Sequence, residues 1–231
     1  MDKEPSEAVG VSSRGTAPLH QVSRLDGSFL EAAETMLTLL GTPEVAARWN
    51  EPSALPKMSV GALACHLGRQ PRRAAELLPA STDQQPLPEV DDHYRQAPWV
   101  RSTSLDDAAN DRSADDAEAE LGVAALLQRV RESLAAVCTL LNDGAAQPVV
   151  FIPWQGWSLR RDNFLLTRML EIVVHSADLA ASLDVPMPEF APEVFEPVRD
   201  LLVRLAVAKH GQQALVSTLT RTDRQQPLSA F

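Results

Sequence analysis

Four ionisable side chains recur along one predicted helix in a pattern that could do chemistry. The segment after Asp162 reads NFLLTRMLEIVVHSADLAASL, with apolar residues around most of its circumference, so most of this helix must be buried. Its ionisable exceptions follow a 3-4-3 spacing, which at about 100° per residue places them on one narrow face. They are Arg168, Glu171, His175 and Asp178. An unpaired charge on a buried face is strongly unfavourable, so these side chains must have compensating partners.

Two kinds of partner can compensate this face. In a purely structural network, Arg168 pairs with Glu171 or Asp178, and neutral His175 bonds a backbone carbonyl. In a metal site, the carboxylate of Glu171 and the imidazole of His175 lie one helical turn apart and bind the same ion. Glu-x-x-x-His supplies only two ligands, so the metal hypothesis needs a third donor from another helix.

His66 is the candidate for this third donor. It lies in VGALACHLGRQ, where it interrupts an apolar seam that runs from Ser59 through Leu63 to Gln70. Alone, a histidine in such a seam is more often a hydrogen-bonded core residue than a ligand. Together with Glu171 and His175 it would leave coordination positions open for water or substrate, which is typical of catalytic metal sites.

The apolar periodicity predicts the elements that must position these residues, and all of them are helices. A short apolar stretch, VVFIPWQGW, is interrupted by Pro153 and Gly156 and predicts at most a short strand or an ordered loop. Pro71 is a candidate kink position in the second helix. The predicted helices run from about Leu25 to Leu40, from an N-cap at Ser59, from about Asp116 to Leu141, from an N-cap at Asp162, and from about Pro192 to His210.

These helices predict an all-α protein with little or no strand. Residues 23–190 are expected to form a four-helix bundle with long crossover connections, which carries the candidate metal site. Residues 191–231 are expected to form a C-terminal helix and a closing segment packed on the bundle. Residues 1–22 have no apolar period and are expected to form a disordered tail.

Composition excludes several classes of protein. The net charge of -10 argues against nucleic-acid binding. No apolar run approaches the roughly 20 residues of a membrane-spanning helix, and the first residues do not resemble a signal peptide. Two cysteines, Cys65 and Cys138, fit a reducing compartment, so we expect a cytoplasmic protein.

The acidity is concentrated in one window. Between Ser81 and Glu120, eleven acidic residues and three arginines give a charge of -8. Because this window has few apolar residues, we expect a long solvated connection rather than a docking face for a basic partner.

Two segments resemble stretches of a known protein family. SVGALACHLGR resembles the family stretch "tv-x-dLvaHl", and R-x-x-E-x-x-x-H-x-x-D-L, from Arg168 to Leu179, resembles the second signature of the mycothiol-dependent maleylpyruvate isomerase family. That family belongs to the DinB-like four-helix bundles. The end of the chain, HGQQALVSTLTRTDRQQPLSAF, is similar to the family's closing segment. The resemblance covers roughly residues 25–231.

The resemblance implies a function. In the family the matching positions bind zinc, so His66, Glu171 and His175 are the implied ligands of a divalent metal, with zinc expected. The metal would activate mycothiol or a similar thiol, which adds to a small electrophilic substrate in an isomerase or an S-transferase. Arg221, in TLTRTDR, resembles a family arginine that could hold a substrate carboxylate. The implied partners are therefore a thiol and a small electrophile, and the protein is expected to be a monomer or a homodimer.

Several alternatives remain open at this point. A non-enzymatic member could use the same fold as a metal- or ligand-binding accessory or sensor protein. Asp178 could orient His175 or pair with Arg168. Cys65 is expected to point away from the metal as a small buried residue. Trp154 and Trp157 are expected to pack on the end of the bundle rather than to cover the site, and no role is expected for His20, His93 and His210.

Overall fold

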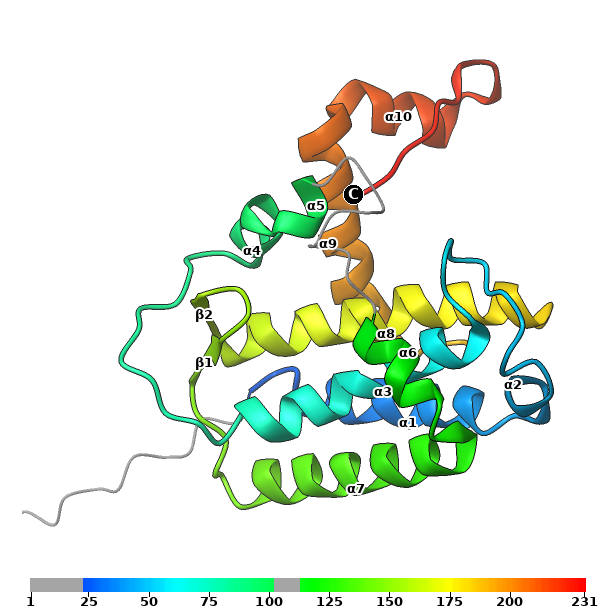
Figure 1. Ribbon diagram of the computed structural model, residues 1–231. Coiled ribbons are helices and arrows are strands. Elements are labelled where there is room, and N and C mark those ends of the chain that lie inside the picture. The colour runs from blue at the N-terminus through cyan, green and yellow to red at the C-terminus, as the bar shows by residue number, and fades with distance from the viewer. Residues whose placement is uncertain (1–22, 102–112) are drawn as a thin grey trace, which may run out of the picture.

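A computed structural model describes residues 23–101 and 113–231 and shows a four-helix bundle (Figure 1). The bundle consists of α1 (Asp26–Leu40), α3 (Val60–Leu77), α7 (Gly122–Asn142) and α8 (Arg161–Leu183). α3 packs against α1, α7 and α8, and α1 also packs against α7 and α8. The apolar stripes of all four helices meet in one core, in which Phe29, Leu63, Leu126 and Phe164 are almost fully buried. The all-α bundle predicted from the sequence is therefore confirmed.

The two helices that carry the candidate ligands are fixed at their ends by local interactions. Ser59 is the N-cap of α3, and its Oγ accepts a hydrogen bond of 3.0 Å from the amide of Ala62. For α8 the predicted N-cap at Asp162 is wrong, because the helix starts at Arg161 directly after a strand, with Arg160 as its N-cap. Asp162 lies in the first turn, where a carboxylate interacts favourably with the helix dipole. α8 ends at Leu183, and its C-cap Asp184 has a φ of 57°, a left-handed conformation that stops the helix.

In its described residues, the long connection after α3 contains three short helices. They are α4 (Val90–Gln96), α5 (Pro98–Arg101) and α6 (Ser113–Ala119), and α6 packs on α3. The sequence predicted one helix from about Asp116, but the chain turns between α6 and α7. Gly122 has a φ of 80° at this turn, in the left-handed region that favours glycine. The break lets α6 lie across α3 while α7 runs alongside it.

A β-hairpin precedes α8. It pairs β1 (Val149–Ile152) with β2 (Trp157–Arg160) in antiparallel register, with Ile152 opposite Trp157. The sequence predicts at most a short strand or an ordered loop here, so the second strand is a correction to that prediction. Gly156, with a φ of 82°, lies in the turn that joins the two strands. The hairpin lies at the N-terminal end of α8 (Figure 1).

The remaining helices lie outside the bundle. α2 (Pro43–Ala47) follows α1, whereas α9 (Pro192–His210) packs on α8 and leads into α10 (Gln212–Thr220) and a 3-10 turn at Thr222–Arg224. The bounds of α9 are as predicted, but α10 was not foreseen. The last residues return to α4 and α5, where the ring of Phe231 packs against Tyr94 and Trp99. The predicted tail at residues 1–22 lies outside the described residues. Within the described ranges, no helix is both long enough and apolar enough to cross a membrane.

Candidate metal centre

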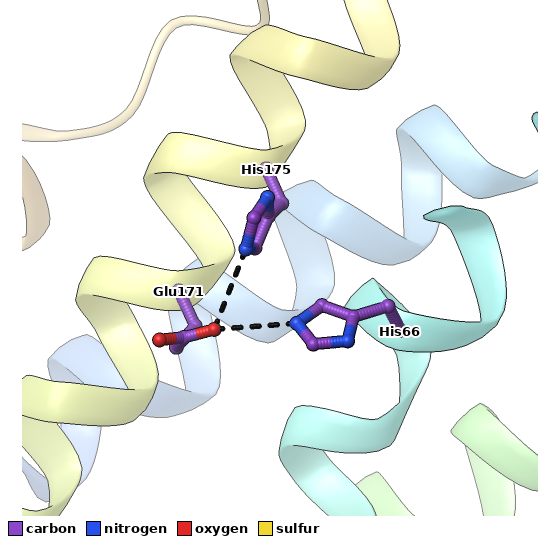
Figure 2. Close-up of side chains that lie close together, drawn as sticks. All are labelled: His66, Glu171 and His175. Carbon is purple, nitrogen blue, oxygen red and sulfur yellow. Dashed lines mark hydrogen bonds and ion pairs between the residues drawn. The ribbon is translucent and has the colours of Figure 1, made fainter. Parts of the chain in front are cut away.

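Three side chains from α3 and α8 converge between the two helices (Figure 2). The nearest ligand atoms of His66, Glu171 and His175 all lie within 4.8 Å of one another. Oε2 of Glu171 lies 3.4 Å from Nε2 of His66 and 3.4 Å from Nε2 of His175. The two imidazole rings are almost perpendicular, with centroids 4.8 Å apart. The structure thus brings together the three residues that the sequence singled out.

Each imidazole is oriented by a second carboxylate. Nδ1 of His175 lies 2.9 Å from Oδ2 of Asp178, and Nδ1 of His66 lies 3.0 Å from Oδ2 of Asp115. An ionised carboxylate can only accept hydrogen bonds, so each Nδ1 carries the donated proton. In the neutral rings, both Nε2 lone pairs then face Glu171. Two lone pairs and a carboxylate oxygen at this spacing favour a cation among them, either a proton or a metal ion.

The pKa values of the cluster show the same preference for a cation. Burial alone would raise the pKa of Glu171, but hydrogen bonds from His175 and His66 outweigh it and hold the pKa well below its usual value. Burial alone would lower the pKa of His175, but hydrogen bonds to Asp178 and Glu171 raise it to about 9. The raised pKa of His175 and the lowered pKa of Glu171 both indicate that this cluster stabilises a positive charge beside the Glu171 carboxylate.

Arg168 does not pair with Asp178, which was one of the two possibilities left open by the sequence. Its Nη1 donates to Oε1 of Gln70 at 2.7 Å, and Nε2 of Gln70 donates to the carbonyl of His66 at 3.0 Å. Arg168 is only 4% exposed. The side chain therefore connects α8 to the backbone of α3 beside the donor cluster.

Asp115 is a site residue that the sequence does not reveal. The sequence predicts it to be part of a solvated acidic connection, but it is only 1% exposed, and its carboxylate also forms an ion pair with Arg69. The next turn of α6 is held in a similar way, because Glu118 accepts bonds of 3.1 Å from both Arg72 and Arg129. For Asp115 and Glu118 of α6 the prediction of a solvated connection is wrong, since arginines of α3 and α7 compensate these two carboxylates. Residues 102–112 of the window lie outside the described part of the chain.

A pocket of about 260 Å³ opens onto the donor cluster. Trp154 lines it and stacks on Arg73, whereas Trp157 donates a bond of 3.1 Å from Nε1 to Nδ1 of His93. His93, for which the sequence indicated no role, lines the same pocket, and burial lowers its pKa to about 4. Two aromatic side chains from distant parts of the chain, Trp99 and Phe231, complete this wall.

Two further residues singled out by the sequence lie away from the donor cluster. Arg221 is exposed, donates from Nη1 to the adjacent carbonyl of Thr220 at 2.8 Å, and is not among the residues that line the pocket. Cys65 is fully buried in the core, and burial raises its pKa to about 12. A thiol with so high a pKa is almost entirely protonated near neutral pH, so Cys65 is unreactive there.

A family model matches the part of the chain that carries this site. The family described as mycothiol maleylpyruvate isomerase N-terminal domain matches residues 29–180, a range that spans more than half of the chain and includes His66, Glu171 and His175. No curated protein and no solved structure matches the chain. The matched range ends within α8, so it leaves out α9, α10 and the closing segment. Because this match covers more than half of the chain and includes the two signature segments, the chain belongs to the mycothiol maleylpyruvate isomerase family.

Proposed function

We propose that the protein is a metal-dependent enzyme that activates a low-molecular-weight thiol, such as mycothiol, for addition to a small electrophile. The observation that carries this proposal is the convergence of two imidazole nitrogens and one carboxylate oxygen, with both rings held at Nδ1 by carboxylates. Carboxylate partners of this kind fix the tautomer of metal-binding histidines and make their free nitrogen more basic.

The donor set fits a divalent ion. Bonds of about 2.1 Å at tetrahedral angles separate two ligand atoms by about 3.4 Å. Oε2 of Glu171 lies at this distance from both Nε2 atoms. Nitrogen and oxygen donors accept several divalent metals, and we expect zinc on the family resemblance. Three protein ligands would leave positions open toward the pocket, as a catalytic site requires.

The reaction needs a thiolate, and free thiols near pKa 8.5 are mostly protonated at neutral pH. The divalent ion would supply this chemistry by lowering the pKa of a bound thiol. When the sulfur adds to an activated double bond, the C–S bond forms and the π electrons move onto the electron-withdrawing group. In an isomerase, rotation about the new single bond is followed by loss of the same thiolate; in an S-transferase, the carbon takes up a proton and the adduct is the product.

Metal content is the first test. We expect one ion per chain in the dialysed wild type, and none in His66→Ala, Glu171→Gln or His175→Ala. His210→Ala is the matched control, because His210 is exposed and contacts the backbone of Ser229. Circular dichroism would verify that each variant is folded. A wild type that stays metal-free even after addition of zinc would overturn the proposal.

Turnover separates the enzyme from an accessory protein. Saturable reaction of mycothiol with an electrophile, lost in His175→Ala and retained in His210→Ala, is the expected result. Regeneration of the thiol would indicate an isomerase, and its stoichiometric consumption an S-transferase. A protein that holds the metal but reacts no thiol with a panel of electrophiles would instead be a metal-binding accessory or sensor member of the family.

A further inference from the structure

Two arginines line the pocket beside the donor cluster without a carboxylate partner. Arg73 comes from α3 and Arg168 from α8, and both border the same cavity. In the two described ranges, no carboxylate oxygen lies within 4.0 Å of either guanidinium. Arg69 lines the same pocket but is paired with Asp115. Arg73 and Arg168 therefore carry positive charges that the protein itself does not neutralise at contact distance.

Both guanidinium groups are held in place by uncharged partners. Arg168 donates to Gln70 at 2.7 Å and from Nε to Oγ1 of Thr167 at 3.3 Å. Cζ of Arg73 lies 4.4 Å from the centroid of the Trp154 ring, in a cation–π contact. Stacking of this kind orients the plane of a guanidinium but leaves the N–H groups at its edges free to donate. Burial, and secondarily the charge of Arg168, lowers the pKa of Arg73 to about 10.

The two arginines occupy equivalent places relative to the donor cluster. Arg73 follows His66 by seven residues on α3, and Arg168 precedes His175 by seven residues on α8. Seven residues are close to two helical turns, so each arginine lies on the same helix face as its histidine, about 10 Å along the axis. The thiol sulfur would bind at the donor cluster, which leaves the arginine end of the pocket to the second reactant.

We propose that Arg73 and Arg168 form an anion-binding subsite for a carboxylate on the electrophilic substrate. Their planar, multiply donating groups suit a carboxylate, and the partly enclosed pocket strengthens charge-assisted hydrogen bonds. The proposal rests on the proposed function, since the position of the thiol identifies which reactant reaches this end. It assigns to Arg73 and Arg168 the task that the family resemblance gives to Arg221, which lies outside the pocket.

Binding of succinate, measured by isothermal titration calorimetry, tests the subsite without turnover. Succinamide is the neutral control of the same size. We expect the zinc-loaded wild type to bind succinate and not succinamide, and Arg73→Gln to raise the dissociation constant for succinate by about tenfold or more. Arg131→Gln makes the same change in net charge on an exposed face of α7 and should leave the constant unchanged. Arg221→Gln should also leave it unchanged.

Any of four results would overturn the proposed subsite. The wild type does not bind succinate, or it binds succinamide as tightly as succinate. Alternatively, Arg73→Gln binds succinate as tightly as the wild type, or Arg221→Gln loses succinate binding. The same titrations on zinc-free protein exclude direct binding of succinate to the metal. Arg73→Gln that retains zinc but loses succinate supports both proposals. A wild type that binds succinate through Arg73 but never binds zinc refutes the proposed function alone.

Discussion

The two candidate histidine ligands obtain the same orientation from carboxylates of different origin. Asp178 lies three residues beyond His175 on α8, so this pair forms wherever the helix forms. Asp115 reaches His66 from α6, a separate helix. The orientation of His66 therefore depends on tertiary packing of α6 against α3, whereas the orientation of His175 is local.

This dependence makes Asp115→Asn a test of ligand orientation. We expect this variant to bind zinc about 10-fold to 100-fold more weakly than the wild type, because the amide removes the charge that makes Nε2 of His66 basic. Competition with a chelator of known affinity measures the change. Asp116→Asn is the matched control, since Asp116 is the exposed neighbour on the same helix.

Equal zinc affinity in the two asparagine variants would contradict this role. Asp115 would then serve only the ion pair with Arg69, and its loss would appear in the free energy of unfolding rather than in metal affinity. Measuring the urea unfolding of both variants without metal separates the two effects.

The difference between Asp178 and Asp115 explains what the sequence could reveal of the site. Helical periodicity predicts which side chains share a face, so it found Glu171, His175 and Asp178 together. It could not find Asp115, because an acidic stretch is typical of solvent exposure and the ion-pair partner of Asp115, Arg69, lies on another helix far away in the sequence. Helical periodicity does place Arg73 near the site, since Arg73 lies seven residues after His66 on the same face of α3.

α3 is the element on which the site depends most, since it packs against three bundle helices and α6. Two glycines allow this crowding. A Cβ at Gly68 would lie 2.7 Å from Leu126 and 2.8 Å from Val130 of α7, and a Cβ at Gly61 would lie 2.6 Å from the indole of Trp49. That indole also donates from Nε1 to the carbonyl of Ala119, at the end of α6. Trp49 thus connects the first turn of α3 to the helix that carries Asp115.

Gly61→Ala should therefore destabilise the protein by about 1–3 kcal/mol, the usual effect of overpacking a tight contact. Urea unfolding measures the change in the free energy of unfolding. Gly27→Ala is the matched control, because a Cβ there has no neighbour within 4 Å in the first turn of α1. It should be neutral or stabilising by up to about 1 kcal/mol. If both alanine variants behave alike, Trp49 adapts freely and does not restrain α6.

The sequence predicts a helix correctly where that helix has a strong apolar stripe and a local stop signal. The bounds of α1 and α9 follow from such patterns. The break between α6 and α7 was missed, because their apolar and alanine-rich sequence is helical on both sides of Gly122 and only packing on α3 separates them. α10 was missed because its apolar face has little to pack against, and only Ala214 in it is buried.

The molecule as a whole is negatively charged, whereas guanidinium groups outnumber carboxylates in its pocket. The protein carries a net charge of -10, yet three guanidinium groups and two carboxylates line the pocket. The overall field slows the approach of an anion, and the local arginines would have to hold it once it enters. The buried charge of Arg168 also lowers the pKa of His93, after the larger effect of burial, and so affects how stability depends on pH.

His93 couples several parts of the molecule. It lies on α4, accepts a hydrogen bond from Trp157 of the hairpin and lines the pocket beside Arg168. Only 3% of its surface is exposed. Burial, and after it the charge of Arg168, lowers its pKa from 6.5 to about 4. The imidazole of His93 is therefore harder to protonate in the folded protein than in the unfolded chain.

Acidification should consequently weaken the wild type through His93. Because the pKa is lower in the folded state, this contribution to stability is present above pH 6.5 and is lost as the pH falls from 6.5 toward 4. Between pH 7 and pH 5 the loss amounts to about 2 kcal/mol.

His93→Gln keeps an acceptor for the Trp157 N–H but cannot titrate. All other titrating groups are common to both proteins, so urea unfolding at the two pH values should show the wild type losing about 2 kcal/mol more than the variant. Equal losses would mean that His93 is protonated within the folded protein, and that the contact with Trp157 opens to admit the charge.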